Sequence, residues 1–160
     1  MTSAEPQRDA ITGLDFHIAG LVKLGAQITS EHGYLLATAP RLSGAQVWLD
    51  FPSVGATENI LTAAVHAKGT TVIDNAAREP EIADLCAMLT SMGADIEGAG
   101  SSTLVIHGVE RGSLRATDHA VVADRIQAAT YLAAVAVCGG EVVLRGGRFE
   151  HMEMLLRRFN

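Results

Sequence analysis

The chain of 160 residues has few of the residues that define several classes of protein. It holds two cysteines, too few for the disulfide framework of small secreted domains. Only 19% of the residues are charged and the net charge is −6, which argues against a nucleic-acid surface because such surfaces need clustered Lys and Arg. Aromatic residues make up only 4%, but hydrophobic residues make up 48%, so wholesale disorder is also excluded.

Targeting and membrane-spanning segments are missing as well. The first ten residues lack the apolar centre of a signal peptide, and the longest strongly apolar run, 128–138, is too short to cross a bilayer. We therefore expect a cytoplasmic protein with no nucleic-acid or membrane partner, whose residues 1–11 are disordered or frayed.

Motifs for metal binding or nucleophilic catalysis do not occur either. The six histidines do not fall at metal-ligand spacings, and the chain has neither HExxH nor CxxC, nor a serine nucleophile elbow. Cys86 lies in an amphipathic stretch and Cys138 ends an apolar one, with no His or Lys nearby in sequence to activate either thiol. We expect both to be small core residues, and we expect no metal site.

What the chain does have is a regular alternation of helical and extended patterns. Helices are expected at 14–24, 55–67, 81–92 and 124–138, with a last one from about residue 150. Strands are expected at 26–29, 34–37, 46–50, 70–74, 94–97, 103–107, 119–122 and 141–145. Glycines at 25 and 93 are expected to end the first and third helices.

The chain also aligns with itself. Gly69 lies over Gly139 and Arg78 over Arg148, both pairs being 70 positions apart. A fixed period in which a helix, a strand, a helix and three strands recur indicates an internal structural repeat. We expect about two and a third units of a longer repeat protein, with an atypical terminal cap as the alternative. The expected units are 12–50, 51–120 and 121–160.

The stretch from Phe51 to Gly55 is the best local candidate for a binding site. A strand end leads into a turn of small residues that opens a helix, where Gly55 lets a ligand approach the backbone and Ser53 can cap. The free N–H groups and the positive dipole end of the first helical turn suit a phosphate or diphosphate. Spacing alone leaves open an ordinary N-cap without a ligand, since the stretch is neither a P-loop nor a dinucleotide fingerprint.

Two further pairs of polar residues open predicted helices. Asp15 and His17 either hydrogen-bond a nucleobase or sugar, or they are a helix-dipole acid and a half-exposed histidine. Asp124 and Arg125 open the helix at 124–138, where Arg125 either turns toward an anionic substrate or is solvated beside a capping Asp124.

Several stretches taken together resemble one enzyme family. They are FPSVGATENI at 51–60, GTTVIDNAAREPEI at 69–82, IHGVER at 106–111 and DRI at 124–126. From about Leu14 to its C-terminus the chain resembles the UDP-N-acetylglucosamine 1-carboxyvinyltransferases. The sister enzymes that act on shikimate 3-phosphate are a weaker match, because the NAAREPEI run favours the nucleotide-sugar branch.

This resemblance implies both a fold and an activity. The fold is α/β (α+β), built from repeated βαβαββ units in an inside-out α/β barrel arrangement, with three units in each of two domains and the active site between the domains. The activity is that of a cytoplasmic transferase of peptidoglycan synthesis, and thus of cell-wall biogenesis, cell shape and the cell cycle. It moves the enolpyruvyl group of phosphoenolpyruvate to the 3′-hydroxyl of UDP-N-acetylglucosamine, and it needs no metal or organic cofactor.

The resemblance also assigns residues to the nucleotide-sugar site. They are Thr12, Gly13, Leu14, Asp15, Phe16, His17, Phe51, Pro52, Ser53, Val54 and Gly55, with Arg125 as a further anion contact.

The chain departs from the family pattern in the groups that carry out the reaction. Thr12 and Gly13 stand where the family has an Arg-Pro pair whose Arg helps to bind the phosphate of phosphoenolpyruvate, and residues 1–11 contain no cysteine to match the catalytic one. The catalytic Asp and a Lys-Asn pair of the family fall outside these residues. We therefore predict no catalytic residue and no turnover for the chain by itself.

Two alternatives remain open at this point. The intact SVGATEN turn is compatible with a non-catalytic module that binds a nucleotide sugar or has a regulatory role. The incomplete repeat units favour a remnant that associates with another chain, or with a second copy, through unpaired strand edges.

Overall fold

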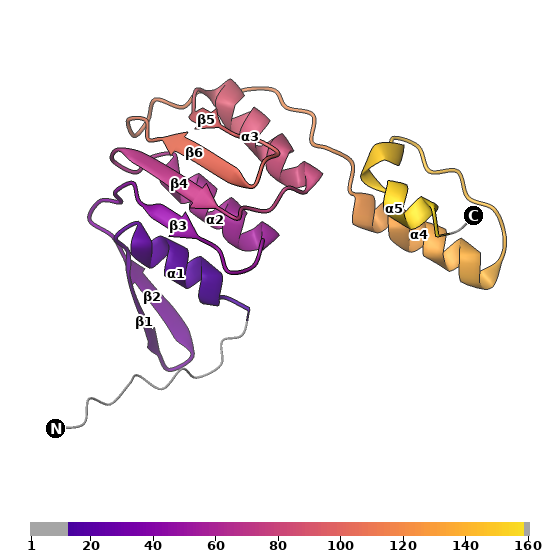
Figure 1. Cartoon of the computed structure of the whole chain (residues 1–160), viewed down its shortest axis with the longest axis horizontal. Helices are drawn as coiled ribbons and strands as arrows, with labels where there is room; N and C mark the ends of the chain where they lie inside the picture. Colours follow the sequence, from indigo (N-terminus) through magenta and orange to yellow (C-terminus); the bar gives the residue numbers. More distant parts are fainter. Residues whose placement is uncertain (1–12, 159–160) are drawn as a thin grey trace. The chain divides into compact units, whose positions relative to one another are not determined.

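The structure is a computed structural model that describes residues 13–158, and the chain divides into two compact units, Met1–Asp118 and His119–Asn160. The first unit contains α1 (Asp15–Lys23), β1 (Gln27–Glu31), β2 (Tyr34–Thr38), β3 (Gln46–Trp48), α2 (Val54–Ala64), β4 (Thr70–Asp74), α3 (Pro80–Met92), β5 (Asp95–Glu97) and β6 (Thr103–His107) (Figure 1). The second unit contains α4 (Arg125–Cys138), the 3-10 turn η1 (Phe149–His151) and α5 (Glu153–Leu156).

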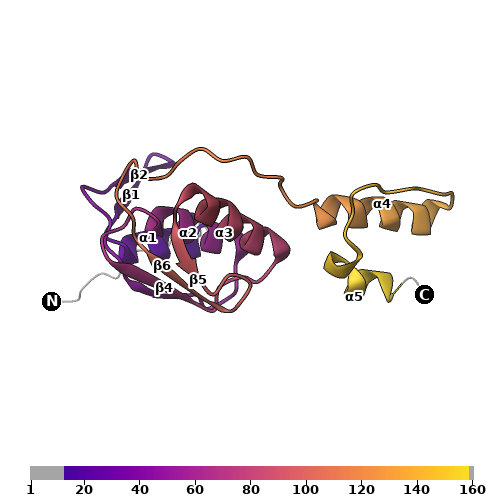
Figure 2. The same ribbon diagram turned by 90° about the horizontal axis from the view of Figure 1, so that it is seen from above.

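A four-stranded sheet in the order β3-β4-β6-β5 organises the first unit. β3 and β4 are parallel, whereas β4 with β6 and β6 with β5 are antiparallel. In chain order β3, α2, β4, α3, β5 and β6 make one βαβαββ unit, the unit that the resemblance implies. The helices α1, α2 and α3 lie on one side of this sheet (Figure 2).

The core lies between that side of the sheet and the helices. Because side chains alternate along a strand, Ile73 of β4 and Ile106 of β6 point inward and are fully buried. Ile60 and Leu61 of α2 cover them and are also fully buried. The opposite face of the sheet is mixed, since it carries polar side chains beside Val72, Val105 and the 66% exposed Trp48. On this face Gln46 Nε2 donates to Asp74 Oδ2 at 3.0 Å.

Glycines end α1 and α3, as the sequence predicts, and another glycine takes part in the turn of the first hairpin. Gly25 and Gly93 follow α1 and α3 with φ of +98° and +108°, a backbone conformation that favours glycine. β1 and β2 pair antiparallel around His32 and Gly33, whose φ angles are +51° and +82°, as a two-residue hairpin turn requires. The predicted strands at 26–29, 34–37, 94–97 and 103–107 are thereby confirmed.

Two predicted strands are wrong, because the described part of the second unit contains no strand at 119–122 or at 141–145. The physical reason lies in pairing. β4, which the predicted repeat aligns with 141–145, is hydrogen-bonded to β3 on one side and β6 on the other. Residues 119–158 contain no hairpin that could supply the second partner, and an isolated pair of short strands is marginally stable at best.

Smaller differences concern the ends of elements. α2 spans Val54–Ala64 rather than 55–67, and the last helix is reduced to η1 and the four residues of α5. The predicted repeat boundaries near residues 50 and 120 stay predictions, and residues 1–11, expected to be frayed, lie outside the described residues. Of the helices in the described part of the chain, none combines the length and apolar character needed to cross a bilayer.

Candidate binding site at the start of helix α2

Ser53 caps α2 and shapes the turn that precedes it. Its backbone is extended, and its Oγ accepts a hydrogen bond from the Ala56 N–H at 3.3 Å. The N–H groups of Val54 and Gly55 have no acceptor within the helix, because the first turn of any helix lacks one. No acidic side chain stands in the first turn of this fully described helix, so nothing there neutralises the positive end of its dipole.

Thr57 holds this turn in place from the buried side of α2. The side chain is fully buried, its Oγ1 donates to the Ser53 carbonyl at 2.8 Å, and the same Oγ1 accepts from the Ala77 N–H at 3.1 Å. The hydroxyl thus ties the start of α2 to the segment that follows β4. Sequence reasoning missed Thr57, although its position four residues after a capping serine was a signal for such a bond.

His17 of α1 contacts the same turn. Its Nδ1 lies 2.6 Å from Asn59 Nδ2. Because an amide nitrogen only donates, the imidazole accepts at Nδ1, and the neutral ring carries its proton on Nε2. A Cβ added at Gly55 would lie 3.1 Å from Cε1 and 3.4 Å from Nε2 of this ring. The structure therefore brings together two of the predicted site residues, and it adds Asn59, which sequence reasoning missed.

The other predicted site residues surround this contact in different environments. Gly13, Leu14 and Asp15 are exposed at the start of α1, whereas Phe16 is half-buried and packs against the core. Thr12 lies outside the described residues.

The residues that precede α2 are accessible from solvent. Phe51 is 64% exposed, Pro52 is exposed, and Val54 is half-buried against the core. The turn is therefore open to solvent at Phe51 and Pro52, whereas Ser53, Val54 and Gly55 are half-buried.

Arg125 lies in the second unit, at the first position of α4. Asp124 caps this helix, since its Oδ1 accepts from the N–H groups of Ile126 at 2.8 Å and Gln127 at 3.2 Å. The capping interpretation of Asp124 is confirmed, and an anion contact by Arg125 stays a prediction.

The two cysteines differ in their surroundings. Cys86 is buried in the core, as expected, and burial raises the pKa of its thiol. Cys138 is exposed, which corrects the prediction of a core residue, because the helix it ends has no buried residue. Within residues 13–158 no three His, Cys, Asp or Glu side chains gather as a metal site would require.

Solved structures share this architecture. The enolpyruvyl transferase NikO from Streptomyces tendae superimposes with a TM-score of 0.68 at 28% identity, over 76% of this chain and 31% of that one. The EPSP synthase from Acinetobacter baumannii gives a TM-score of 0.57 at 28% identity, over 78% of this chain and 28% of that one. The fold is therefore the mixed α/β fold of the enolpyruvyl transferases.

Sequence comparison gives the family. The family model for EPSP synthase (3-phosphoshikimate 1-carboxyvinyltransferase) matches residues 14–158, and the chain belongs to this family. Within it the chain is a homologue of UDP-N-acetylglucosamine 1-carboxyvinyltransferases, which confirms the resemblance. It is 55% identical to the enzyme of Corynebacterium jeikeium over 157 residues and 51% identical to that of Mycobacterium tuberculosis over 159 residues.

These matches cover nearly all of this chain and a minor part of the relatives. They include 97% and 98% of this chain, but only 37% and 38% of the Corynebacterium and Mycobacterium enzymes. The chain thus spans little more than a third of the length of the curated relatives that it matches.

Proposed function

We propose that this chain binds UDP-N-acetylglucosamine at the start of α2. We place that binding in the cytoplasmic step of peptidoglycan synthesis that moves the enolpyruvyl group of phosphoenolpyruvate to the 3′-hydroxyl of the nucleotide sugar. The observation that carries the proposal is the contact of His17 with Gly55 and Asn59. It joins the two stretches, 12–17 and 51–55, that the family resemblance assigns to this ligand.

The chemistry of the turn supports a diphosphate ligand. The N–H groups of Val54 and Gly55 and the positive dipole end of α2 favour an anion, with an electrostatic contribution of about 0.3–1 kcal/mol for an exposed site. Gly55 has no Cβ in the path of the ligand, and the Nε2–H of His17 supplies a donor beside it. Phe51, 64% exposed next to the turn, offers an aromatic face on which a uracil ring can stack.

These groups bind and orient a ligand, but they do not complete the reaction. Transfer requires one group that protonates the enol carbon and another that removes the proton of the sugar hydroxyl. His17 accepts from Asn59 at Nδ1, and Thr12 stands where the family has the arginine that helps to bind phosphate. We propose that the chain by itself binds the nucleotide sugar without turning it over.

Calorimetric titration with UDP-N-acetylglucosamine, UDP and N-acetylglucosamine tests the binding. We expect saturable heat for the first two ligands and none for the free sugar, because the diphosphate provides the interaction with α2. Absence of heat at millimolar UDP-N-acetylglucosamine would remove the proposal. A phosphate-release assay with both substrates tests turnover separately, and release above the substrate blank would show that the chain is active by itself.

A second candidate function, association with a second copy of the chain, is favoured by the β1–β2 hairpin. Its strands form a separate two-stranded sheet, and Tyr34, Leu35 and Leu36 are 73%, 40% and 48% exposed. Exposed apolar strands of this kind pair readily with other chains. Sedimentation velocity distinguishes the two cases, since a monomer at all concentrations excludes this association.

A further inference from the structure

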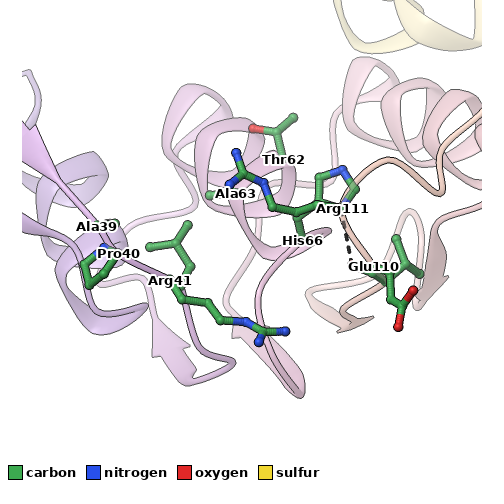
Figure 3. A pocket seen from close by; sticks show the side chains of 10 residues that line it. Ala39, Pro40, Arg41, Thr62, Ala63, His66, Glu110 and Arg111 are labelled. Atoms are coloured by element: carbon green, nitrogen blue, oxygen red, sulfur yellow. Dashed lines mark hydrogen bonds between the residues drawn. The ribbon is translucent and has the colours of Figure 1, made fainter.

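A groove of about 720 Å³ lies beside the C-terminal half of α2, at the other end of the helix from Ser53 (Figure 3). Its volume falls in the range of small-molecule sites, about 300–1,000 Å³. Three segments line it: 39–42 after β2, the end of α2 with Thr62, Ala63 and His66, and 109–111 after β6.

The backbone fixes the two walls of this groove. On one wall the Leu42 carbonyl accepts from the Lys68 N–H at 2.9 Å, and on the other the Val109 N–H donates to the Val65 carbonyl at 2.8 Å. Glycine is required behind the second wall, because a Cβ at Gly108 would collide with the Ala67 carbonyl oxygen. One wall is therefore attached to the loop that follows α2 and the other to the end of α2 before any ligand arrives, which lowers the entropy lost on binding.

Each wall carries one exposed arginine, Arg41 on the first and Arg111 on the second. Neither guanidinium has a hydrogen bond or an ion pair with another residue in the range 13–158. The acidic residue of the lining, Glu110, points its carboxylate away from the guanidinium of Arg111 (Figure 3). Two unpaired cations in one groove contrast with the net charge of −6 of the whole chain.

The remaining lining adds one oriented imidazole and an apolar surface. His66 Nδ1 lies 3.3 Å from the Val109 carbonyl (Figure 3). Because a carbonyl only accepts, Nδ1 donates, and the neutral ring keeps Nε2 as an acceptor. Pro40, Leu42 and Ala63 provide apolar area beside these polar groups.

We propose that this groove binds a small organic phosphate monoester, whose phosphate draws the exposed side chains of Arg41 and Arg111 toward it and whose organic body lies along Pro40, Leu42 and Ala63. The planar donor forks of two arginines match the three terminal oxygens and the double charge of such a phosphate. This site is separate from the proposed nucleotide-sugar site, since α2 has 11 residues, or about 16 Å at 1.5 Å per residue, between the two.

Phenyl phosphate is a suitable probe, because it combines the phosphate with an apolar body. It is titrated into the ¹⁵N-labelled full chain and followed by amide chemical shifts, in parallel with benzoate and phenol. We expect saturable shifts at 41–42, 62–66 and 109–111 with phenyl phosphate at millimolar concentration, and weaker or no shifts with the other two compounds. Absence of saturable shifts in these segments would overturn the site, and equal affinity for benzoate would overturn the preference for phosphate.

The arginines are tested together and against a matched control. In the double variant Arg41→Gln/Arg111→Gln the affinity should fall at least tenfold, whereas Arg115→Gln, an exposed arginine outside the groove, should leave it unchanged. Unchanged amide dispersion elsewhere shows that the double variant is folded, so unchanged affinity in it contradicts the proposal. Saturating UDP-N-acetylglucosamine should not displace phenyl phosphate, and competition between the two would show that the groove is not a separate site.

Discussion

The side-chain amide of Asn59 donates a hydrogen bond to Nδ1 of His17 across 2.6 Å, and this bond joins α2 to α1. Asn59 lies six residues after the capping Ser53 and about one turn after Gly55. The bond fixes the ring so that the Nε2–H of a neutral His17 is free for another acceptor. A ligand at the start of α2 thus meets a donor whose direction is set before binding.

Replacing Asn59 with Leu removes this bond while keeping the approximate volume of the side chain. Because the pair is exposed, we expect the free energy of unfolding to fall by only about 0.5–1 kcal/mol. The affinity for UDP-N-acetylglucosamine should fall as well, since the ring of His17 is no longer oriented. Urea unfolding and calorimetric titration measure the two effects.

Thr62→Ala is the matched control on the same helix. The Thr62 hydroxyl donates to the carbonyls of Glu58 and Asn59 within α2, at 2.9 and 3.1 Å, and alanine is a good helix former. We expect stability and nucleotide-sugar affinity to stay unchanged. If Asn59→Leu behaves like this control, the bond to His17 has no part in binding.

Gly55→Ala tests the open approach to the backbone. The added Cβ would lie 3.1 Å from His17 Cε1, so the ring must shift by a few tenths of an ångström, and it would stand where the diphosphate is proposed to meet the helix. We expect at least a tenfold loss of UDP-N-acetylglucosamine affinity in calorimetry. Stability should change little, since the helix propensity of alanine, up to about 1 kcal/mol better than glycine, offsets the contact.

Gly147→Ala serves as the control for Gly55→Ala. A Cβ there would make an ordinary contact of 3.8 Å with Met152 Cε, in the second unit. It should leave binding unchanged. Equal affinity of Gly55→Ala and the original chain would show that the diphosphate does not approach this turn.

The buried thiol of Cys86 should make the free energy of unfolding decrease at alkaline pH. Burial raises its pKa in the folded state, so the folded chain holds the proton at pH values where the unfolded chain has lost it. The resulting stability is complete below the ordinary thiol pKa of about 8.5 and is lost as pH rises through the raised value. Urea unfolding at pH 7.5 and pH 10 should show this loss.

Cys138, the second cysteine, provides the control for the pH dependence assigned to Cys86. Cys138→Ala should keep the alkaline loss of stability, because that side chain is exposed, whereas Cys86→Ala should reduce it. An identical decline in both variants would assign the pH dependence to other groups.

The sequence predicts those features of the fold and the site that depend on residues close together in the chain. The start of α2 was predictable because Ser53 and Gly55 are neighbours, and the hairpin at His32 and Gly33 was predictable for the same reason. The contact of His17 with Asn59 was not, since it spans 42 positions and depends on how α1 packs on α2.

The two strands that were predicted wrongly also show that a local signal is not sufficient. The residues at 119–122 and 141–145 have β-branched character, which is local, but a strand also needs partners for its N–H and C=O groups. β4 has the same character and forms because β3 and β6 flank it. The β propensity of the residues therefore predicted β4 correctly, but it was not sufficient to form strands at 119–122 and 141–145.

Two buried threonines differ in their hydrogen bonding, so the same substitution should affect stability differently at the two positions. Thr57 Oγ1 accepts from the buried Ala77 N–H, whereas Thr71 Oγ1, equally buried on β4, has no hydrogen-bond partner among the residues that the structure describes. Valine removes the hydroxyl at nearly constant volume in both cases. Thr57→Val leaves the Ala77 N–H without an acceptor, which should cost about 1–3 kcal/mol of the free energy of unfolding.

Thr71→Val should instead be neutral or stabilising, because it removes an unpaired polar atom from the core and suits a β-strand. Urea unfolding of the two variants side by side measures the difference. Thr57→Val should also weaken UDP-N-acetylglucosamine binding, since the Thr57 hydroxyl holds the Ser53 carbonyl in place. Equal stability losses in both variants would contradict the hydrogen bonding described for this core.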